Sequence, residues 1–336
     1  MEPLRIGVLG AARIAETVIV APATETGQRL VAVAARDRAR AEAFAARHGV
    51  ERVLGDYAAV LADDTVEVVY NPLVNALHGP WNLAAVRAGK HVLSEKPFAS
   101  TAAEAREVFA EARRAGLTVL PAFHYHYHPV ARRLLELLDS GELGELRAVE
   151  AVTLIPAPAE DDPRWSYALA GGALMDVGCY GLHLHRLLAP WAGGAPRVVT
   201  ARAGERRGRP GVDEWLEAAL EFPRGAVGEL RCGMAAREVV FRCRVTGSRG
   251  EATAASFVRP DWDDRVTVAT PEGTRTEHLG PRSSFAYQLE AFAAHLREGA
   301  PLGTGEGAEI ATMELVDDCS RAAGLPVRPR ATAPFG

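Results

Sequence analysis

Short apolar segments alternate with helix-length segments over the first 120 residues, and this alternation limits the possible folds more than any other feature. The apolar segments are predicted strands, because each is rich in valine, leucine and alanine and is followed by a helical pattern. They lie at residues 5–9, 30–34, 66–70, 91–94 and 118–120. Strands that alternate with helices form a parallel, doubly wound sheet whose ligands bind at the carboxyl ends of the strands. We therefore expect an α/β fold with functional residues directly after the strands.

The pattern changes after about residue 122, and 336 residues are enough for a second domain. A helix at 130–138, a strand at 146–154, a loop rich in proline and acidic residues, and a long helix from about Ala173 come first. Several short strands separated by turns follow, which is typical of an antiparallel sheet. These strands and the two closing helices lie at 198–202, 216–222, 226–232, 242–247, 265–269, 285–297 and 306–323. We predict an α/β domain at 1–122 and an α+β domain with a mostly antiparallel open sheet at 123–336.

Composition excludes several classes of protein. Hydrophobic residues make up 48% of the chain and charged residues 24%, as in ordinary globular proteins. A net charge of -5 provides no broad cationic field for nucleic-acid phosphates or anionic lipids. No apolar run approaches the roughly 18 residues of a membrane span, and no signal-peptide core precedes the first strand. We therefore expect a cytoplasmic protein without nucleic-acid or membrane partners.

The cysteines indicate a reducing environment. There are four of them, Cys179, Cys232, Cys243 and Cys319, and none forms a C-x-x-C pair. Four cysteines are too few for a disulfide framework in a chain of this length. We expect reduced, buried thiols.

The turn after the first strand carries a variant of the dinucleotide-binding fingerprint. Residues 10–15 read G-A-A-R-I-A, which matches G-x-G-x-x-G/A at two of its three positions. Gly10 permits the tight turn, and Ala12 adds one methyl group where a glycine would let the backbone approach a pyrophosphate. A generic strand-to-helix turn would explain part of this pattern, but its position favours a Rossmann dinucleotide site. The residues of that site would be Gly10, Ala12, Arg13 and Ile14.

The end of the second strand discriminates between the two nicotinamide dinucleotides. An acidic residue there binds the ribose 2′-hydroxyl of NAD, whereas a basic residue accommodates the 2′-phosphate of NADP. Arg36 follows the strand directly, Ala35 occupies the position of the acid, and Arg38 and Arg40 lie nearby. This arrangement favours NADP(H), although Asp37 leaves room for NAD(H). The alternative is that these arginines only solvate the start of a helix.

Lysine is rare enough in this sequence to be informative. Of the 38 basic residues only Lys90 and Lys96 are lysines. Lys96 follows the strand at 91–94, where ligands of a parallel sheet bind. Lysine supplies a compact amine whose pKa depends on its surroundings, which arginine does not. We therefore predict a functional role for Lys96 and a solvated surface position for Lys90, which lies on a helix-to-strand turn.

A second group of candidate residues lies in the segment 171–180, which reads G-G-A-L-M-D-V-G-C-Y. If it is helical, Asp176 and Tyr180 stand at i and i+4 and project from one face, which His183 extends. A tyrosine can transfer a proton to or from an alcohol oxygen, and a neighbouring lysine ammonium favours its phenolate. The alternative is a helix with ordinary core contacts.

Three histidines alternate at His124, His126 and His128, directly before Pro129. Alternating histidines on a strand would share one face and could bind zinc. The proline and the following helix indicate that the strand has already ended, and no acidic residue lies close by. We therefore expect no metal site, and a substrate or cofactor contact from one of these histidines.

Together these motifs resemble the Gfo/Idh/MocA family of oxidoreductases over nearly the entire chain. Residues 70–78 read Y-N-P-L-V-N-A-L-H, similar to Y-I-P-L-P-N-S-L-H of the family. Residues 89–97 read G-K-H-V-L-S-E-K-P, similar to G-K-H-V-L-x-E-K-P, and residues 172–180 and 287–292 resemble two further family segments. The branch that the chain resembles contains dimeric dihydrodiol dehydrogenase, glucose-fructose oxidoreductase and sugar 3-ketoreductases.

The resemblance implies roles for individual residues. Lys96 and Tyr180 would flank the reacting carbon, with Tyr180 as proton donor or acceptor, Lys96 orienting and polarising the substrate, and Asp176 supporting both. The nicotinamide half of the cofactor would lie along Leu73, Asn75, His78, Glu95 and Pro97. Two positions depart from the family pattern, since Val74 replaces a proline and His126 replaces an arginine near the nicotinamide. His126 and His183 are candidate substrate contacts.

The combined expectation is an NADP(H)-dependent oxidoreductase that transfers a hydride between nicotinamide and a sugar or other polyhydroxylated carbon. A nucleotide-sugar ketoreductase is one form of this activity, and a trans-dihydrodiol or aldose dehydrogenase is the alternative. Some members of this fold are non-catalytic dinucleotide-binding regulators, but the presence of both Lys96 and Tyr180 argues against that role. The resemblance also implies a homo-oligomer, either a dimer or a tetramer.

Overall fold

The computed structural model describes residues 2–331, and the chain divides into two compact units. The first unit holds the chain up to Ala122, together with Phe285–Glu306 and the described residues from Arg330. The second unit holds Phe123–Ser284 and Gly307–Pro329. The change of unit after Ala122 coincides with the change in sequence pattern. The expected second domain, 123–336, includes Phe285–Glu306 and the described residues from Arg330, which belong to the first unit.

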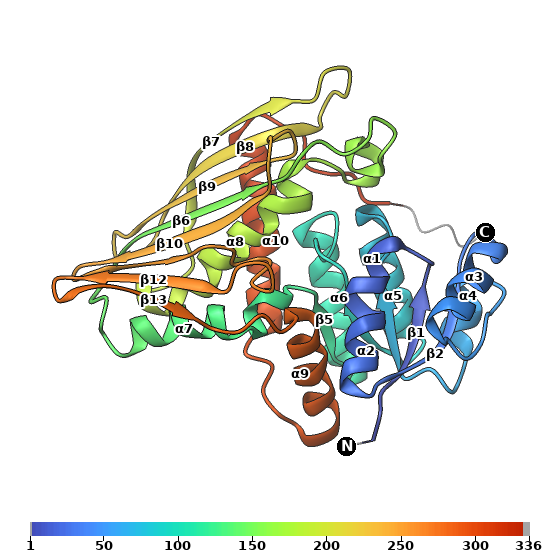
Figure 1. Cartoon of the computed structure of the whole chain (residues 1–336). Coiled ribbons are helices and arrows are strands. Elements are labelled where there is room, and N and C mark those ends of the chain that lie inside the picture. The colour runs from blue at the N-terminus through green and yellow to red at the C-terminus, as the bar shows by residue number, and fades with distance from the viewer. Residues whose placement is uncertain (1, 332–336) are drawn as a thin grey trace. The chain divides into compact units, whose positions relative to one another are not determined.

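The first unit is built on a parallel sheet in the order β2-β1-β3-β4-β5 (Figure 1). The strands are β1 (Arg5–Leu9), β2 (Arg29–Ala34), β3 (Val68–Asn71), β4 (His91–Ser94) and β5 (Val119–Pro121). An isolated parallel bridge between Val33 and Val53 continues the order beyond β2. The chain order therefore reverses at β1, between β2 and β3, which is where dinucleotides bind in sheets of this kind. The prediction of a doubly wound parallel sheet is confirmed.

Helices of the first unit begin and end where the sequence provides caps. Asp37, Asp56 and Thr101 each accept a hydrogen bond from the backbone N–H three residues further on. A continuous helical stretch after β1 comprises α1 (Arg13–Ala15), a π-helical turn (Glu16–Val20) and α2 (Ala21–Thr26). The other helices of this unit are α3 (Arg38–His48), α4 (Tyr57–Ala62), α5 (His78–Arg87), α6 (Ala102–Ala115) and α9 (Ser284–Glu298). At the start of α6 the N–H of Glu104 donates to Thr101 Oγ1, and Glu104 Oε2 accepts the N–H of Ser100.

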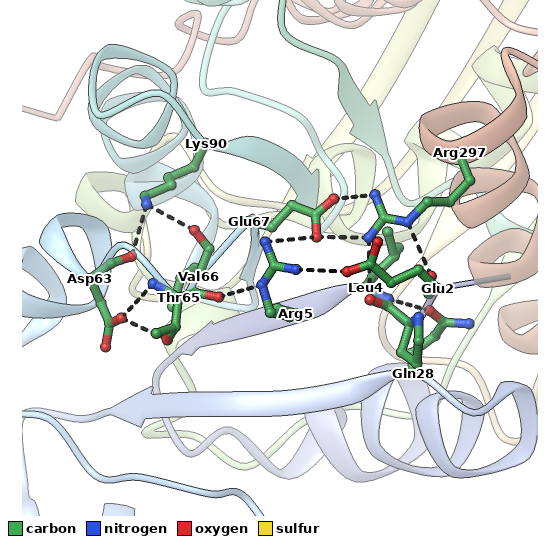
Figure 2. A network of polar contacts seen from close by, with 11 residues as sticks. Glu2, Leu4, Arg5, Gln28, Asp63, Thr65, Val66, Glu67, Lys90 and Arg297 are labelled. Atoms are coloured by element: carbon green, nitrogen blue, oxygen red, sulfur yellow. Dashed lines mark hydrogen bonds and ion pairs between the residues drawn. The ribbon is translucent and has the colours of Figure 1, made fainter.

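Lys90 is a buried member of a polar network near the start of β1 and β3 (Figure 2). Its Nζ donates to the carbonyl oxygens of Asp63 and Val66, each at 2.8 Å. In the same network Arg297 of α9 donates to Glu67 Oε2 at 2.8 Å (Figure 2). The expectation that Lys90 is a solvated surface residue is wrong. A compact ammonium is suited to this position because its N–H groups can point at two carbonyls inside the protein.

Replacing Lys90 with methionine is expected to lower the free energy of unfolding by about 1–3 kcal/mol, because two buried carbonyls lose their donor. Urea denaturation followed by circular dichroism would measure the loss. Arg47→Met is the control. That side chain is 73% exposed, and its ion pair with Glu16, at 3.5 Å, is also exposed and should contribute little to stability. Equal losses of unfolding free energy in Lys90→Met and Arg47→Met would contradict this expectation. They would show that water donates to the two carbonyls in place of the ammonium.

The second unit contains a sheet of eight strands in the order β13-β12-β11-β10-β6-β9-β8-β7. All neighbouring pairs are antiparallel except β6 and β9, which are parallel. The strands are β6 (Leu146–Leu154), β7 (Arg197–Glu205), β8 (Asp213–Glu221), β9 (Val227–Gly233), β10 (Val240–Gly247), β11 (Glu251–Ala254), β12 (Arg265–Thr270) and β13 (Gly273–His278). The prediction of a mostly antiparallel sheet is confirmed, although the sequence patterns did not reveal β11 and β13.

Helix α8 (Cys179–Leu187) packs closely on this sheet, and glycines permit the approach. A Cβ at Gly178 would overlap Cys232 Sγ, and a Cβ at Gly181 would overlap Leu230 Cδ1. Both neighbours belong to β9, so the helix is held against the middle of the sheet. Figure 1 shows α10 (Glu306–Ala322) on the same side of the sheet as α8. The remaining long helix of this unit is α7 (Pro129–Asp139).

Two further expectations from the sequence concern the whole chain. The four cysteines are buried and unpaired, as predicted. Within residues 2–331, no helix combines the length and the apolar character needed to cross a lipid bilayer.

Candidate active site

The turn after β1 has the backbone that a dinucleotide site requires. Gly10 has a φ of +97°, which strains any other residue, and its N–H donates to Ala34 O at 2.7 Å. Ala12 is the N-cap of α1 and makes no side-chain capping hydrogen bond, so it leaves the N–H groups of the first turn to a ligand. Arg13 and Ile14 form that turn and are exposed. This geometry fits a pyrophosphate at the positive end of a helix.

Basic residues and a tyrosine gather beyond this turn, at the end of β2. Arg36 is exposed directly after the strand, and Arg40 of α3 donates from Nη2 to Ala11 O at 3.1 Å. The hydroxyl of Tyr57 would lie 3.6 Å from a Cβ built on the glycine of the turn. Burial raises the pKa of Tyr57, whereas the charge and backbone of Arg36 and the charge of Arg40 oppose that shift. The sequence pattern marked Arg40 as one of the basic residues near Arg36, but it did not mark Tyr57, which lies outside the fingerprint.

Lys96 lies on the turn after β4, next to the buried imidazole of His78. The Nδ1 of His78 is 2.6 Å from Pro97 O, and its Nε2 is 2.7 Å from Leu73 O. Burial, assisted by the charge of Lys96, lowers the pKa of His78 to about 4, although the two carbonyl contacts oppose the shift. His78 therefore connects the turn after β3 with the turn after β4. Its ring nitrogens are occupied by the protein, so its effect on a cofactor would come through these two turns.

A chain of buried amides supports the same two turns. Asn71, the last residue of β3, donates from Nδ2 to His78 O at 3.2 Å and to Asn82 Oδ1 at 2.8 Å. Asn82 of α5 donates in turn to Ser94 Oγ at 2.8 Å. All of these side chains are buried. Asn71 lies in the 70–78 motif but received no role from the sequence, and Asn82 lies outside every motif.

The remaining predicted cofactor residues lie at this same edge of the sheet. Glu95 is buried, and its Oε1 accepts a hydrogen bond from the Tyr70 hydroxyl at 3.1 Å. Asn75 begins the short 3-10 turn that leads into α5. Leu73 lies near the first turn, because its Cδ2 would be 3.3 Å from a Cβ at Gly10. The residues predicted after β1, β3 and β4 thus meet within the first unit.

Tyr180 lies on α8 of the second unit among aromatic rings. It is buried, and the ring centroids of Phe123, His124 and Tyr125 lie 5.7, 5.8 and 6.2 Å from its own. The Nε2 of His124 is 3.3 Å from the Tyr180 Oη, and the Nδ1 of His124 is 2.8 Å from Ser284 Oγ. The hydroxyl of Tyr180 therefore has an imidazole partner inside its own unit. Sequence analysis could not find this pair, because 56 positions separate the two residues.

Asp176 precedes Tyr180 in a π-helical turn (Leu174–Gly178), not in the regular α-helix that the sequence predicts. Its Oδ2 lies 3.5 Å from Arg164 Nη1. Arg164 is held in turn by Asp162, whose Oδ1 accepts from its Nε at 2.9 Å. π-helical turns inside helices are frequent at functional sites.

A buried ion pair fixes the segment that leads into the π-helical turn. The side chain of Asp213 is completely buried and that of Arg328 is 2% exposed. Arg328 Nε donates to Gly171 O at 2.7 Å, and Asp213 Oδ2 accepts the N–H of Leu174 at 2.6 Å. Gly172, between these contacts, has a φ of +120°, and a Cβ there would overlap Asp213 Oδ1. The ion pair thus explains the glycine pair that opens the motif.

His183 follows Tyr180 on α8 and is completely buried. Its Nδ1 is 2.7 Å from the Tyr125 hydroxyl, and its Nε2 is 3.5 Å from Glu309 Oε1. Its ring stacks on Phe123 with 4.0 Å between centroids. These contacts surround His183 with protein groups.

His126 and His128 have different surroundings. His126 is partly exposed, and its buried Nδ1 has no hydrogen-bond partner among the described residues. Burial, the nearby His183 and arginines together lower the pKa of His126 to about 3. His128 instead caps α7, since its Nδ1 accepts the N–H of Val130 at 3.1 Å. In the part of the chain that the structure describes, no three His, Cys, Asp or Glu side chains are grouped so that they could hold a metal ion.

Two family models match the chain. One is described as an oxidoreductase family with an NAD-binding Rossmann fold and covers residues 4–123. The other is described as the GFO/IDH/MocA C-terminal domain and covers residues 131–253.

Individual proteins match nearly the full length. D-xylose 1-dehydrogenase (NADP(+)) 2 of Haloferax volcanii is 35% identical over 94% of this chain and 95% of its own. A dTDP-3,4-didehydro-2,6-dideoxy-alpha-D-glucose 3-reductase of Actinomadura kijaniata is 41% identical over 89% of each chain. The crystal structure of a 3-ketoreductase from Actinomadura kijaniata, in complex with NADP and TDP-benzene, superposes with a TM-score of 0.85 at 31% identity. It covers 94% of this chain and 96% of that one.

Proposed function

The chain belongs to the Gfo/Idh/MocA family of oxidoreductases, and from this premise we propose that it transfers a hydride between NADP(H) and a sugar carbon. The reaction interconverts a carbonyl and a secondary alcohol, or an aldose and its lactone. A nucleotide-linked ketosugar is the first substrate class to consider, because relatives of this name match most of the chain. The observation that carries the proposal is the position of Lys96 in a chain that contains only two lysines. It lies on the turn after β4, where the carbonyl of the next residue, Pro97, contacts His78.

The residues around β1 and β2 fit NADP. Gly10 and the uncapped start of α1 suit the pyrophosphate, as described above. Arg36 and Arg40 supply positive charge beyond β2 for a 2′-phosphate. Asp37 is engaged as the N-cap of α3, since its Oδ1 accepts the N–H of Arg40 at 3.2 Å. The capping role uses one oxygen of Asp37, so the case for NADP(H) rests on the charge of Arg36 and Arg40.

The proposed chemistry divides between cofactor and protein. Bound NADPH supplies the hydride to the carbonyl carbon. The Tyr180 hydroxyl gives its proton to the carbonyl oxygen as negative charge develops there, and the Lys96 ammonium stabilises that charge. Asp176 supports the pair, and His126 is the proposed substrate contact. In the opposite direction the Tyr180 phenolate accepts the proton of the alcohol.

A substrate panel tests the proposal. NADPH oxidation would be followed with a TDP-linked 3-ketosugar, and NADP⁺ reduction with D-xylose, D-glucose and a trans-dihydrodiol. We expect turnover with a sugar substrate and none with the dihydrodiol. Tight NADPH binding without turnover of any compound would instead support the non-catalytic regulator.

Arg36→Ala is expected to reduce the preference for NADPH over NADH by about 1–3 kcal/mol, or roughly 5- to 150-fold in dissociation constant. The reason is the loss of a charged donor to the 2′-phosphate. Fluorescence titration with both cofactors would measure it. Arg47→Ala is the matched control, since that side chain is 73% exposed and paired with Glu16. Tighter binding of NADH than NADPH by the unaltered protein would overturn the cofactor assignment.

We also propose a homo-oligomer, a dimer or a tetramer, that works in the cytoplasm. The face of the sheet away from α8 exposes Trp215 and Val227, at 40% and 50%. Arginine and glutamate side chains pair around them, for example Arg202 with Glu217. A surface of this kind suits contact with a second copy of the chain. The unpaired cysteines support a reducing compartment.

A further inference from the structure

The contacts of Tyr180 within the second unit bear on how its proton is controlled. Resting on the proposed function, we propose that His124, which lies between Ser284 and Tyr180, donates a hydrogen bond to the Tyr180 oxygen. This donation stabilises the phenolate that forms when Tyr180 gives up its proton. His124 and Ser284 would thus be positioning residues for the proton transfer.

The geometry places the imidazole between two hydroxyl groups. Its Nε2 is 3.3 Å from Tyr180 Oη and its Nδ1 is 2.8 Å from Ser284 Oγ. His124 is 1% exposed and Ser284 is completely buried, so the protein fixes the ring on both sides. A hydroxyl can donate or accept, whereas each nitrogen of a neutral imidazole does only one. The tautomer of His124 therefore determines the direction of both hydrogen bonds.

Only one tautomer is compatible with proton donation to substrate. When the Tyr180 O–H points at a substrate oxygen, its own oxygen can only accept from His124, so Nε2 must carry the hydrogen. The Nδ1 lone pair then accepts the Ser284 O–H. In the opposite tautomer the Tyr180 proton turns toward Nε2 and away from substrate. The Ser284 hydroxyl supports this arrangement by supplying the hydrogen that Nδ1 accepts.

The proton balance of the step is simple. The O–H bond of Tyr180 breaks as an O–H bond forms on the substrate oxygen, while the carbonyl carbon receives the hydride and NADPH is oxidised. The hydrogen on His124 Nε2 stays on the ring throughout and donates to the phenolate. Solvent returns a proton to Tyr180 before the next turnover.

Other ionisable groups surround the pair. Asp176 stands in the preceding turn beside Arg164, and Tyr125 lies 6.2 Å from the Tyr180 ring. Burial raises the pKa of Tyr125 well above its usual value and lowers that of His183, so both stay neutral.

More distant charges also act on the region. Arg186 and Glu309 act on Tyr125 and His183. All of these groups are unchanged in the variants below, so differences between variants report on His124 and Ser284.

Nuclear magnetic resonance tests the inference without any substrate. The protein would be labelled with ¹³C at the phenolic carbon of its seven tyrosines, and Tyr180→Phe would identify the Tyr180 signal. His124→Leu is expected to raise the pKa of Tyr180 by about one pH unit, because the phenolate loses a donor. His124→Gln, whose amide can donate from near the Nε2 position, should restore most of the shift. Ser284→Ala should raise the pKa by a smaller amount, and Ser284→Thr should not change it.

Kinetics provide the second readout. In the oxidative direction the acidic limb of the pH profile of kcat/KM should move upward in His124→Leu by the same amount as the Tyr180 pKa. An unchanged Tyr180 pKa in both His124→Leu and Ser284→Ala would overturn the inference. If His124→Leu does not fold, Ser284→Ala compared with Ser284→Thr decides the question alone. If the Tyr180 pKa shifts as expected but the protein turns over no sugar, the proposed function is wrong. The inferred hydrogen bond between His124 and Tyr180 is then still supported.

Discussion

Replacing Tyr180 with phenylalanine is expected to lower kcat about 10²- to 10⁴-fold and to leave the dissociation constant for NADPH unchanged. The variant keeps the ring, so the edge-on contacts with Phe123, His124 and Tyr125 and the packing of α8 persist. The hydroxyl is removed, and with it the proton donor and the contact with His124 Nε2. Single-turnover measurements with a confirmed substrate would isolate the chemical step, and NADPH fluorescence would measure cofactor binding. Turnover near the unaltered rate would mean that the proton comes from another group, with His126 or His183 as the next candidates.

Lys96→Arg is the companion variant. It preserves the charge, but a planar guanidinium cannot occupy the place of an ammonium on the turn that His78 holds, so activity should fall. If Lys96→Arg loses activity while Tyr180→Phe keeps full activity, the proton transfer would be assigned to Lys96 and not to Tyr180.

Replacing Arg328 with methionine is expected to lower the free energy of unfolding of the second unit by about 3–5 kcal/mol. The change leaves the carboxylate of Asp213 buried without its cation and removes the donor to Gly171 O. Tryptophan fluorescence during urea denaturation is a suitable measurement, because four of the five tryptophans, Trp165, Trp191, Trp215 and Trp262, lie in the second unit. The same variant should also lose activity, since the ion pair fixes the segment before Asp176.

The control is Arg321→Met on α10. That side chain is 59% exposed and pairs with Asp318 on the surface, so its loss should change stability by less than about 1 kcal/mol. Similar losses of unfolding free energy in Arg328→Met and Arg321→Met would contradict the prediction. They would show that the ion pair of Asp213 with Arg328 does not stabilise the second unit.

The strands of the first unit could be predicted from sequence because parallel strands are buried on both faces and give continuous apolar runs. β1, for example, is buried from Ile6 to Leu9. β13 escaped prediction because Gly-Thr-Arg-Thr-Glu-His contains no apolar residue and lies almost fully exposed. The π-helical turn around Asp176 has no sequence signature either, since its hydrogen bonding differs from that of an α-helix only by one position.

The part of the candidate site that could be predicted consists of residues that follow strands closely in the sequence. Gly10, Arg36 and Lys96 each stand within two residues of the end of a strand, so their position at one edge follows from the topology of a parallel sheet. The partners of these residues could not be predicted. Ser284 meets His124 from 160 positions away, and Arg328 meets Asp213 from 115. Contacts at such separation depend on the packing of the whole unit and leave no local pattern.

The strand that carries no apolar residue has a consequence for solubility. β13 is the last strand on one side of the eight-stranded sheet, so one of its edges offers unpaired N–H and C=O groups to any passing chain. Its Arg275 and Glu277 are engaged with Glu142 and Arg133 at the loop and helix beside the sheet. A further strand could add to this edge only by displacing or burying those charges. This edge of the sheet is thereby protected against pairing with further strands, and apolar substitutions in β13 would remove that protection.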